Sequence, residues 1–255
     1  MEKNIILAGV GGQGILSIAF VIDNAALEAG FHFKQAEVHG MAQRGGAVQS
    51  NLRYGDSEIY SDIIPTGRAD LILSVEPLEV LRYWHFLNPD GWVATSITPY
   101  VNIPDYPDAD ELYAELAAFD RIIMVDTAHI ARAAGNLRAQ NMVAVGAASQ
   151  LLDFTEEQLL KYVEVLFERK GEKIVAVNRR AFTYGRAAGL FFRALVDGGM
   201  PRLAVIKLCG KLDPETVQPE HAASWVSAIG GDEVKLAAVL AEKEPVSSDR
   251  AAAFA

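Results

Sequence analysis

The stretch Gly9-Val10-Gly11-Gly12-Gln13-Gly14 decides how the N-terminal part of this chain folds. It follows a short apolar run, Ile5 to Ala8, that predicts a buried strand, and it opens a segment over 15–29 with apolar residues at helical spacing. A strand, a glycine-rich turn and a helix in this order place backbone N–H groups and a helix N-terminus against a phosphate. The stretch therefore predicts an anion site and leaves the anion unidentified.

The bulk composition limits the class of protein. The chain has 255 residues, of which 51% are hydrophobic, enough for one large domain or one domain with an appendage. The formal net charge of -10 opposes binding to nucleic acid or to anionic membranes. A small phosphorylated ligand stays compatible with this charge, because backbone N–H groups and one or two arginines dominate at short range.

Cysteine and histidine usage excludes several kinds of site. Cys209 is the single cysteine, so the chain can form neither an internal disulfide nor a four-cysteine iron–sulfur cluster. The histidines show no metal-ligand spacing, and we expect no metal. No apolar run reaches the roughly 18 residues of a membrane span, and Met1 to Asn4 lead into a strand without a signal peptide. We therefore expect a cytoplasmic protein.

The rest of the pattern alternates between strands and helices. Apolar runs predict strands over 31–38, 70–75, 92–97 and 122–125. Helical spacing predicts helices over 77–87, 109–119, 156–170 and 178–196. Two more strand-like runs, 47–53 and 58–64, flank a tight-turn signal and predict an inserted β-hairpin. The predicted fold is an open, mostly parallel, Rossmann-like α/β sheet with an inserted β-hairpin and a helical C-terminal half.

The alternation stops near Gly198-Gly199-Met200-Pro201. Beyond this point prolines, a Gly230-Gly231 pair and an alanine-rich end predict an appendage. We therefore expect a main domain over 1–197 and a C-terminal extension over 198–255, to which the sequence assigns no role.

Several scattered motifs match one known family. The most specific is Glu37-Val38-His39-Gly40-Met41-Ala42-Gln43-Arg44-Gly45-Gly46. The others are Ala69-Asp70-Leu71, Glu76-Pro77-Leu78-Glu79, Gly135-Asn136, Asn141, Asn178, Ala181-Phe182 and Gly185. With the glycine turn, these residues make the chain resemble the small subunit of indolepyruvate:ferredoxin oxidoreductases, a branch of the 2-oxoacid:ferredoxin oxidoreductases. The resemblance spans residues 4–190, and the chain end after about 200 departs from the usual length of the family.

The resemblance implies a CoA-dependent oxidative decarboxylation of an arylpyruvate, with electrons passed to ferredoxin. It also implies that thiamine diphosphate and the iron–sulfur clusters belong to a large partner subunit, through which ferredoxin is reduced. The single cysteine agrees with this division. The Gly-Asp-Gly signature for thiamine binding is missing as well, because Gly231-Asp232 is followed by Glu233. The chain then works by holding CoA as a co-substrate near chemistry that its partner supplies.

Each candidate residue has a structural alternative. Gly9, Gly11, Gly12 and Gly14 form either a phosphate cradle or a tight turn that lets the helix pack closely. The Gln13 amide either donates to a ligand oxygen or caps the helix start. No residue is assigned as a catalytic nucleophile, and the candidate binding residues are Gly9, Gly11, Gly12, Gln13, Gly14, Glu37, His39, Arg44, Gly45, Gly46 and Glu76.

The candidate residues from Glu37 onward differ from one another in their chemistry. Glu37 lies where a dinucleotide fold places its ribose-binding acid, or it orders the following loop. Arg44, between glycines, suits a phosphate of CoA or a carboxylate of the partner, and a solvated arginine is the alternative. His39 has no partnered nucleophile nearby and is assigned to the loop or to an interface. Glu76 either lines the cleft or favours a helix N-terminus.

Two other classes of function stay open from the sequence. One is a stand-alone NAD(P)- or flavin-dependent oxidoreductase of Rossmann type, for which Glu37 is the best argument. The other is an architectural subunit whose glycine turn serves only packing. A homodimer of the isolated chain, through a surface meant for its partner, also stays open.

Overall fold

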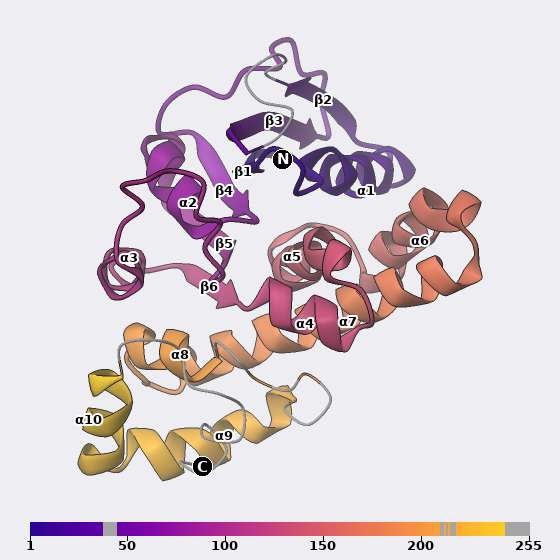
Figure 1. Ribbon diagram of the computed structural model, residues 1–255. Coiled ribbons are helices and arrows are strands. Elements are labelled where there is room, and N and C mark those ends of the chain that lie inside the picture. The colour runs from indigo at the N-terminus through magenta and orange to yellow at the C-terminus, as the bar shows by residue number, and fades with distance from the viewer. Residues whose placement is uncertain (38–44, 210–211, 213, 215–217, 243–255) are drawn as a thin grey trace.

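A six-stranded mixed sheet forms the centre of the molecule (Figure 1). The computed structural model describes residues 1–37, 45–209, 212, 214 and 218–242. The strands are β1 (Glu2–Val10), β2 (His32–Glu37), β3 (Ala47–Gly55), β4 (Ala69–Ser74), β5 (Leu87–Ser96) and β6 (Ile122–Val125). The helices are α1 (Ile15–Glu28), α2 (Pro77–Tyr83), α3 (Ala109–Ala117), α4 (Thr127–Ala133), α5 (Gln140–Ala148), α6 (Glu156–Phe167), α7 (Glu172–Asp197), α8 (Arg202–Cys209), α9 (Ala222–Trp225) and α10 (Glu233–Ala241).

The strand order is β2-β3-β1-β4-β5-β6, and only β3 runs against its neighbours. Strands β1, β4, β5 and β6 are parallel to one another. The chain leaves β1 toward one side of the sheet for β2 and β3, and then returns to the other side for β4. Such a reversal opens a crevice beyond the carboxyl end of the central strand. The predicted fold class, a mostly parallel α/β sheet with a helical C-terminal half, is confirmed.

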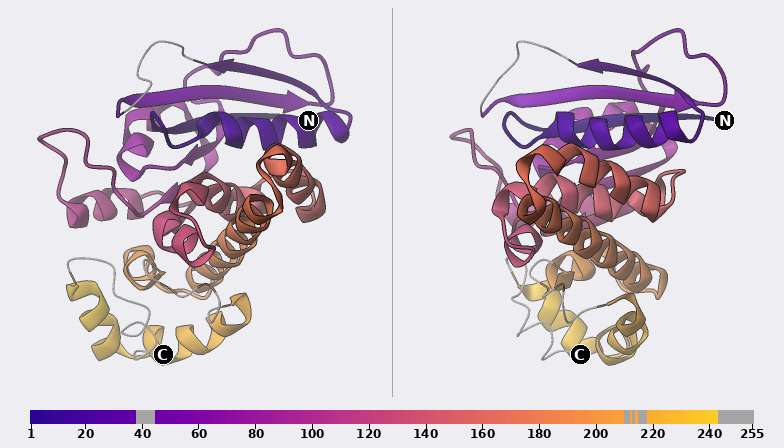
Figure 2. Two further views of the ribbon diagram at one scale, coloured as in Figure 1. Left: turned by 45° about the vertical axis from the view of Figure 1, so that its right-hand side comes forward. Right: turned by 90° about the vertical axis from the view of Figure 1, so that its right-hand side faces the viewer.

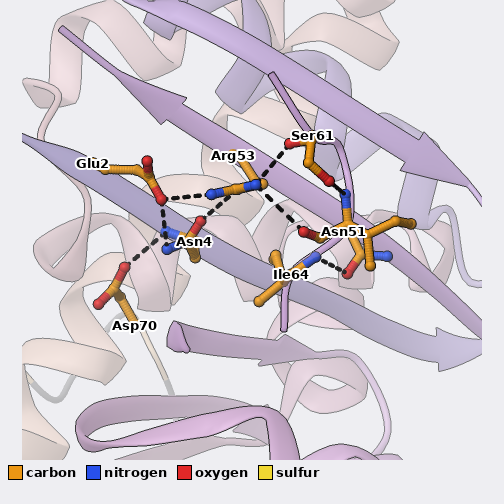
Figure 3. A network of polar contacts seen from close by, with 8 residues as sticks. Glu2, Asn4, Asn51, Arg53, Ser61, Ile64 and Asp70 are labelled. Carbon is orange, nitrogen blue, oxygen red and sulfur yellow. Dashed lines mark hydrogen bonds and ion pairs between the residues drawn. The ribbon is translucent and has the colours of Figure 1, made fainter. Parts of the chain in front are cut away.

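The second arm of the predicted hairpin is wrong, because residues 58–64 form no strand. Strand β3 pairs antiparallel with β2 instead, with Phe33 opposite Tyr54. Figure 3 shows how β3 side chains hold the 61–64 segment: Arg53 Nη1 donates to Ser61 O at 2.7 Å, and Ile64 N donates to Asn51 Oδ1 at 3.3 Å. Ile64 is fully buried against the sheet. An apolar segment that crosses a sheet face therefore has the same sequence pattern as a strand.

Helices cover the two faces of the sheet unequally. Helices α1, α5 and α7 bury the main core on one face, with α6 packed against α1 and α7. On the other face, α2 and the 58–64 segment enclose a smaller cluster around Ile6 and Ile72. Among the described residues, no helix has the length and apolar character needed to span a membrane.

The helices α5 and α7 approach each other closely through small residues. A Cβ atom at Gly146 on α5 would overlap the carbonyl oxygen of Phe182 on α7. One at Gly185 on α7 would in turn overlap the carbonyl oxygen of Val143 on α5. Protein interiors tolerate no such overlap, so only glycine fits at either position. This contact aligns the N-terminal ends of both helices with the start of α1.

The start of β5 differs from what its residues indicate. Asn88-Pro89-Asp90-Gly91 has the composition of a turn and predicts one, but it lies inside the strand as an irregularity, where the register shifts between Ala69 and Leu71. The Asn88 side chain accepts a hydrogen bond from Asp90 N at 2.9 Å, the local bond that gave the turn signal. A large apolar side chain in a predicted helix is most simply a core residue; this holds for the Phe191-Phe192 pair, which is fully buried, and fails for Trp84, which is 58% exposed.

Helices α8, α9 and α10 lie at the end of the molecule opposite the β2–β3 edge of the sheet (Figure 1, Figure 2). Helix α8 contacts α3, β6 and α7, and α9 contacts α7. Lys207 on α8 is 1% exposed. Its Nζ lies 2.7 Å from Asp110 Oδ1 and donates to the carbonyl oxygens of Leu240, at 3.0 Å, and Glu242. The domain boundary near residue 198 stays a prediction.

Lys207→Ala tests this attachment. We expect the free energy of unfolding to fall by about 3 kcal/mol, because two carbonyl oxygens and one carboxylate lose the buried ammonium group that they share. Urea denaturation followed by circular dichroism measures the change. Lys173→Ala, at an exposed lysine without an ion pair among the described residues, is the control and should shift stability by less than about 0.5 kcal/mol. Equal effects of the two variants would contradict the attachment.

Candidate functional site

A cleft of about 600 Å³ opens beyond the carboxyl ends of the parallel strands. Its walls come from the turn after β1, the loop after β5, α4, and the turn between α4 and α5. The lining residues are Gly11, Gly12, Gln13, Thr98, Pro99, Tyr100, Ala128, Arg132, Leu137, Arg138 and Gln140. The volume lies within the range of small-molecule sites, and the position is the one where open α/β sheets bind ligands.

The glycine turn is closed by its own glutamine. Val10 N donates to Gln13 Oε1 at 2.7 Å, and Gln13 N donates to Val10 O at 3.0 Å. A Cβ atom at Gly9 would lie 2.9 Å from both Gln13 Oε1 and Ile15 Cδ1, so Gly9 serves the packing of the turn. The Gln13 side-chain oxygen therefore ties the turn back to β1 and does not cap α1, which has no side-chain cap hydrogen bond. A role of Gln13 toward a ligand stays a prediction.

The loop that contains Gly45 and Gly46, here called the second glycine loop, occupies part of the expected phosphate cradle. Gly11 N donates to Gly46 O at 2.8 Å, and Gly45 N donates to Gly11 O at 3.2 Å. These bonds leave Gly12 N and Gly14 N as turn donors without a partner among the described residues. Gly12 and Gly14 have positive φ angles of 102° and 79°, which L side chains rarely adopt. The turn N–H groups that an anion could meet are therefore those of Gly12 and Gly14, and anion binding there stays a prediction.

Two arginines line the cleft, and no sequence motif singled them out. Arg132 lies in the last turn of α4, and Arg138 follows Asn136 in the short turn before α5. Neither guanidinium forms an ion pair within the part of the chain that the structure describes. Both are exposed, in a chain whose formal net charge is -10. The fold brings these two arginines to the same cleft, so no spacing in the sequence predicts their proximity.

A smaller hollow of about 280 Å³ lies on the other side of the glycine turn. It shares Gly12, Gln13 and Arg138 with the cleft. Its further lining residues are Gly14, Ser17, Asn136, Ala139, Asn141, Phe167, Lys170, Ile174 and Asn178. Three asparagines that carry the family resemblance, separated by up to 42 positions from Asn136 to Asn178, thus meet in one place.

Glu76 holds the wall of the cleft and is absent from its lining. The side chain is 1% exposed and caps α2 by accepting from Glu79 N at 2.9 Å. The other carboxylate oxygen accepts from Tyr100 N at 3.2 Å and from the Tyr106 hydroxyl. Burial raises the pKa of Glu76, and these hydrogen bonds partly offset the rise. Glu76 therefore fixes the 98–108 loop rather than presenting a charge to a ligand.

Glu37 ends β2 beside a buried carboxyl group on α1. Asp23 is 7% exposed, and its Oδ1 has no hydrogen-bond partner among the described residues. Burial raises the pKa of Asp23 to about 7, and the nearby Glu37 carboxylate adds to the rise. His39 and Arg44 lie outside the described residues, so their assignments stay predictions. Among the described residues, no three His, Cys, Asp or Glu side chains gather as metal ligands.

Comparisons with known proteins agree with the fold. A family model for pyruvate ferredoxin/flavodoxin oxidoreductase matches residues 4–188. Indolepyruvate oxidoreductase subunit IorB of Thermococcus kodakarensis is 38% identical over 194 residues, which cover 72% of this chain and 94% of that protein. The gamma subunit of a keto/oxoacid ferredoxin oxidoreductase from Geobacter sulfurreducens has the same fold, with a TM-score of 0.56 at 23% identity, and covers 74% of this chain and 98% of that one.

A larger structure shares the fold as well. The 2-oxoglutarate:ferredoxin oxidoreductase from Magnetococcus marinus, solved with 2-oxoglutarate, coenzyme A and succinyl-CoA bound, aligns with a TM-score of 0.58 at 20% identity. The alignment covers 90% of this chain and 45% of that one, so this chain spans less than half of the larger polypeptide.

The fold defines the class as an α/β protein with a mostly parallel, Rossmann-like sheet and a cleft beyond the carboxyl ends of its strands. The chain belongs to the pyruvate ferredoxin/flavodoxin oxidoreductase family. The predicted resemblance to indolepyruvate-type small subunits is confirmed, and so is the expectation of a subunit for the oxidative decarboxylation of 2-oxoacids. A stand-alone NAD(P)- or flavin-dependent enzyme finds no support in these comparisons.

The two positive-φ glycines of the turn allow a matched stability test. Gly12→Ala should lower the free energy of unfolding by about 1–2 kcal/mol, the strain of a left-handed alanine, because no atom lies within 4 Å of its new Cβ. Gly14→Ala should cost about 3 kcal/mol, because its Cβ would also lie 2.5 Å from Asn141 Nδ2 and displace a bond to Gly14 O. Urea denaturation of both variants gives the values, and equal losses would rule out the Asn141 contact.

Asp23 predicts a pH dependence of stability. Its pKa rises from the ordinary 3.8 to about 7 on folding, so the folded state holds an extra proton between these values. Stability from this group is therefore complete below about pH 4 and is lost as the pH rises toward 7, by at most about 1.4 kcal/mol per pH unit. In Asp23→Asn this loss should disappear. Unfolding free energies of both proteins at several pH values measure the difference, and parallel curves would contradict the prediction.

Proposed function

We propose that this chain is the subunit without clusters or thiamine of an indolepyruvate-type, arylpyruvate-oxidising 2-oxoacid:ferredoxin oxidoreductase, and that its cleft holds CoA. The observation that carries the proposal is the pair of unpaired guanidinium groups, Arg132 and Arg138, in the cleft that the glycine turn lines. A diphosphate at Gly12 would meet turn N–H groups and two bidentate cations at once.

The floor of the cleft is polar and ordered. Ser96 Oγ and Thr127 Oγ1 share a hydrogen bond of 2.8 Å, and Thr127 Oγ1 donates to Gln140 Oε1 at 3.3 Å. Thr98 Oγ1 donates to Asp126 Oδ1 at 2.7 Å. These bonds fix Thr98 and Gln140, which line the cleft, so a ligand finds positioned side chains.

The composition of this chain supports a division of the chemistry between two subunits. When bound, thiamine diphosphate supplies the carbanion chemistry of decarboxylation, and iron–sulfur clusters accept the electrons. A chain with one cysteine has no four thiolates for a cluster. The proposed work of this chain is to bind the CoA nucleotide and aim its thiol at the partner. Positioning of this kind lowers a barrier by about 7–11 kcal/mol in the best-oriented cases.

The proposed partner is a large subunit that carries the thiamine and the clusters and passes electrons to ferredoxin. Exposed apolar side chains stand at the rim of the cleft: Tyr100 is 45% exposed, Val101 71% and Leu137 41%. Leu16, two positions after the glycine turn, is 56% exposed. Contiguous exposed apolar groups beside a binding cleft are typical of protein interfaces. A partner seated on this rim would close the cleft over CoA.

Charge removal at the two arginines tests the proposal. Arg132→Gln with Arg138→Gln should raise the Kd for CoA by about 100-fold, because two charge-assisted contacts to the diphosphate are lost. Isothermal titration of CoA into the full chain, and into the complex that co-purifies with it from the native host, measures the change. Arg121→Gln is the control, since Arg121 pairs with Asp90 away from the cleft and should leave the Kd unchanged.

Three results would overturn this function. Unchanged CoA affinity in the double variant would remove the cleft as the CoA site. Tight binding of NAD(P) or flavin, with oxidoreductase turnover by the chain alone, would favour the stand-alone enzyme. Absence of any CoA-induced rise in melting temperature, in chain and complex alike, would leave the architectural subunit. Arg44→Ala, at a residue outside the described part, is a further variant for the same titration.

A further inference from the structure

The smaller hollow beside the glycine turn has the chemistry of a second phosphate site. Lys170, in the short turn between α6 and α7, lines it without an ion pair among the described residues, and its Nζ lies 5.1 Å from the centroid of the Phe167 ring. Arg138 lines both the hollow and the cleft. None of the lining residues is acidic. A hollow with two cations and no carboxylate favours an anion.

The asparagines of the hollow are already committed to the fold. Asn141 Nδ2 donates to Gly14 O at 3.3 Å, and Asn178 Nδ2 donates to Ile174 O at 2.8 Å. Asn136 Oδ1 accepts from Arg138 N at 2.9 Å. These bonds shape the walls of the hollow. They leave Lys170 Nζ and the Ser17 hydroxyl as donors for a ligand, beside Arg138.

The two hollows differ in the part of CoA that each can take. The cleft is the larger, and exposed Tyr100 and Leu137 line its open side, so it suits the long pantetheine arm whose thiol must leave this chain. The smaller hollow, about 280 Å³, has room for a phosphorylated ribose. Gly12 and Arg138 belong to both, which places the diphosphate between them.

We propose that the hollow formed by Ser17, Arg138 and Lys170 binds the 3′-phosphate of CoA, so that this chain discriminates CoA from 3′-dephospho-CoA. The inference rests on the proposed function and adds the group that sets specificity. Lys170 is the counter-ion of the 3′-phosphate, and the glycine turn with Arg132 and Arg138, which borders both hollows, holds the diphosphate common to both compounds.

Titration of the two compounds tests the assignment. The full chain, and the complex that co-purifies with it, should bind CoA about tenfold more tightly than 3′-dephospho-CoA, the equivalent of about 1.4 kcal/mol. Lys170→Gln should weaken CoA by about tenfold and leave 3′-dephospho-CoA unchanged, which also shows that the variant is folded. Arg169→Gln removes the same charge one residue away, from a side chain outside the hollow, and should keep the wild-type preference.

The outcomes separate this inference from the proposed function. Equal affinities of the wild-type protein for the two compounds, or equal weakening of both by Lys170→Gln, would overturn the 3′-phosphate site. CoA binding that still depends on Arg132 would, in that case, leave the proposed function intact. If neither compound binds the chain or the complex, the proposed function and the inference both fall.

Discussion

The site depends on a single close approach, that of Asn141 to Gly14. The N-cap of α1 has a φ of 79° and leaves no room for a Cβ, since such an atom would lie 2.5 Å from Asn141 Nδ2. In that space the amide donates to Gly14 O. Helix α5 is thereby fixed against the start of α1, and the direction of the turn N–H groups follows from it. Gly14 is thus required for packing, and the same residue can also belong to the proposed phosphate cradle, so the two interpretations of the turn are compatible.

The helical half of the chain is part of this support. Helix α5 takes its position from α7, because Gly146 and Gly185 let the two backbones approach within the distance that any side chain would fill. The same contact brings Asn178 on α7 to the hollow that Asn141 on α5 lines. Residues far apart in the sequence therefore reach the glycine turn through helix packing, and a change at Gly185 acts on the ligand site without touching it.

The sequence predicted those features whose residues lie close together along the chain. The turn, its strand and its helix lie within about 25 consecutive residues, so their pattern sufficed. Arg132, Arg138 and Lys170 come to the turn through tertiary contacts, and a lone basic residue in a helix or turn carries no local signature. The prediction for the 58–64 segment failed for a different reason: it rested on apolar residues, and Ile59 and Ile64 are buried by a segment that crosses the sheet face without pairing as a strand.

The loops around the cleft are tied to one another before any ligand arrives. Gly11 exchanges two backbone hydrogen bonds with Gly45 and Gly46, and Asn102 Nδ2 donates to Gly45 O at 2.7 Å. Glu76 holds the same 98–108 loop from below through Tyr100 and Tyr106. Connections after β1, β4 and β5 thus form one bonded unit with the second glycine loop. Since ordering a loop costs binding free energy, a ligand that meets an ordered cleft retains more of its contact energy as affinity. A net charge of -10 then matters little, because fixed N–H groups and guanidinium groups act over a few ångströms while the diffuse field is screened over about 10 Å.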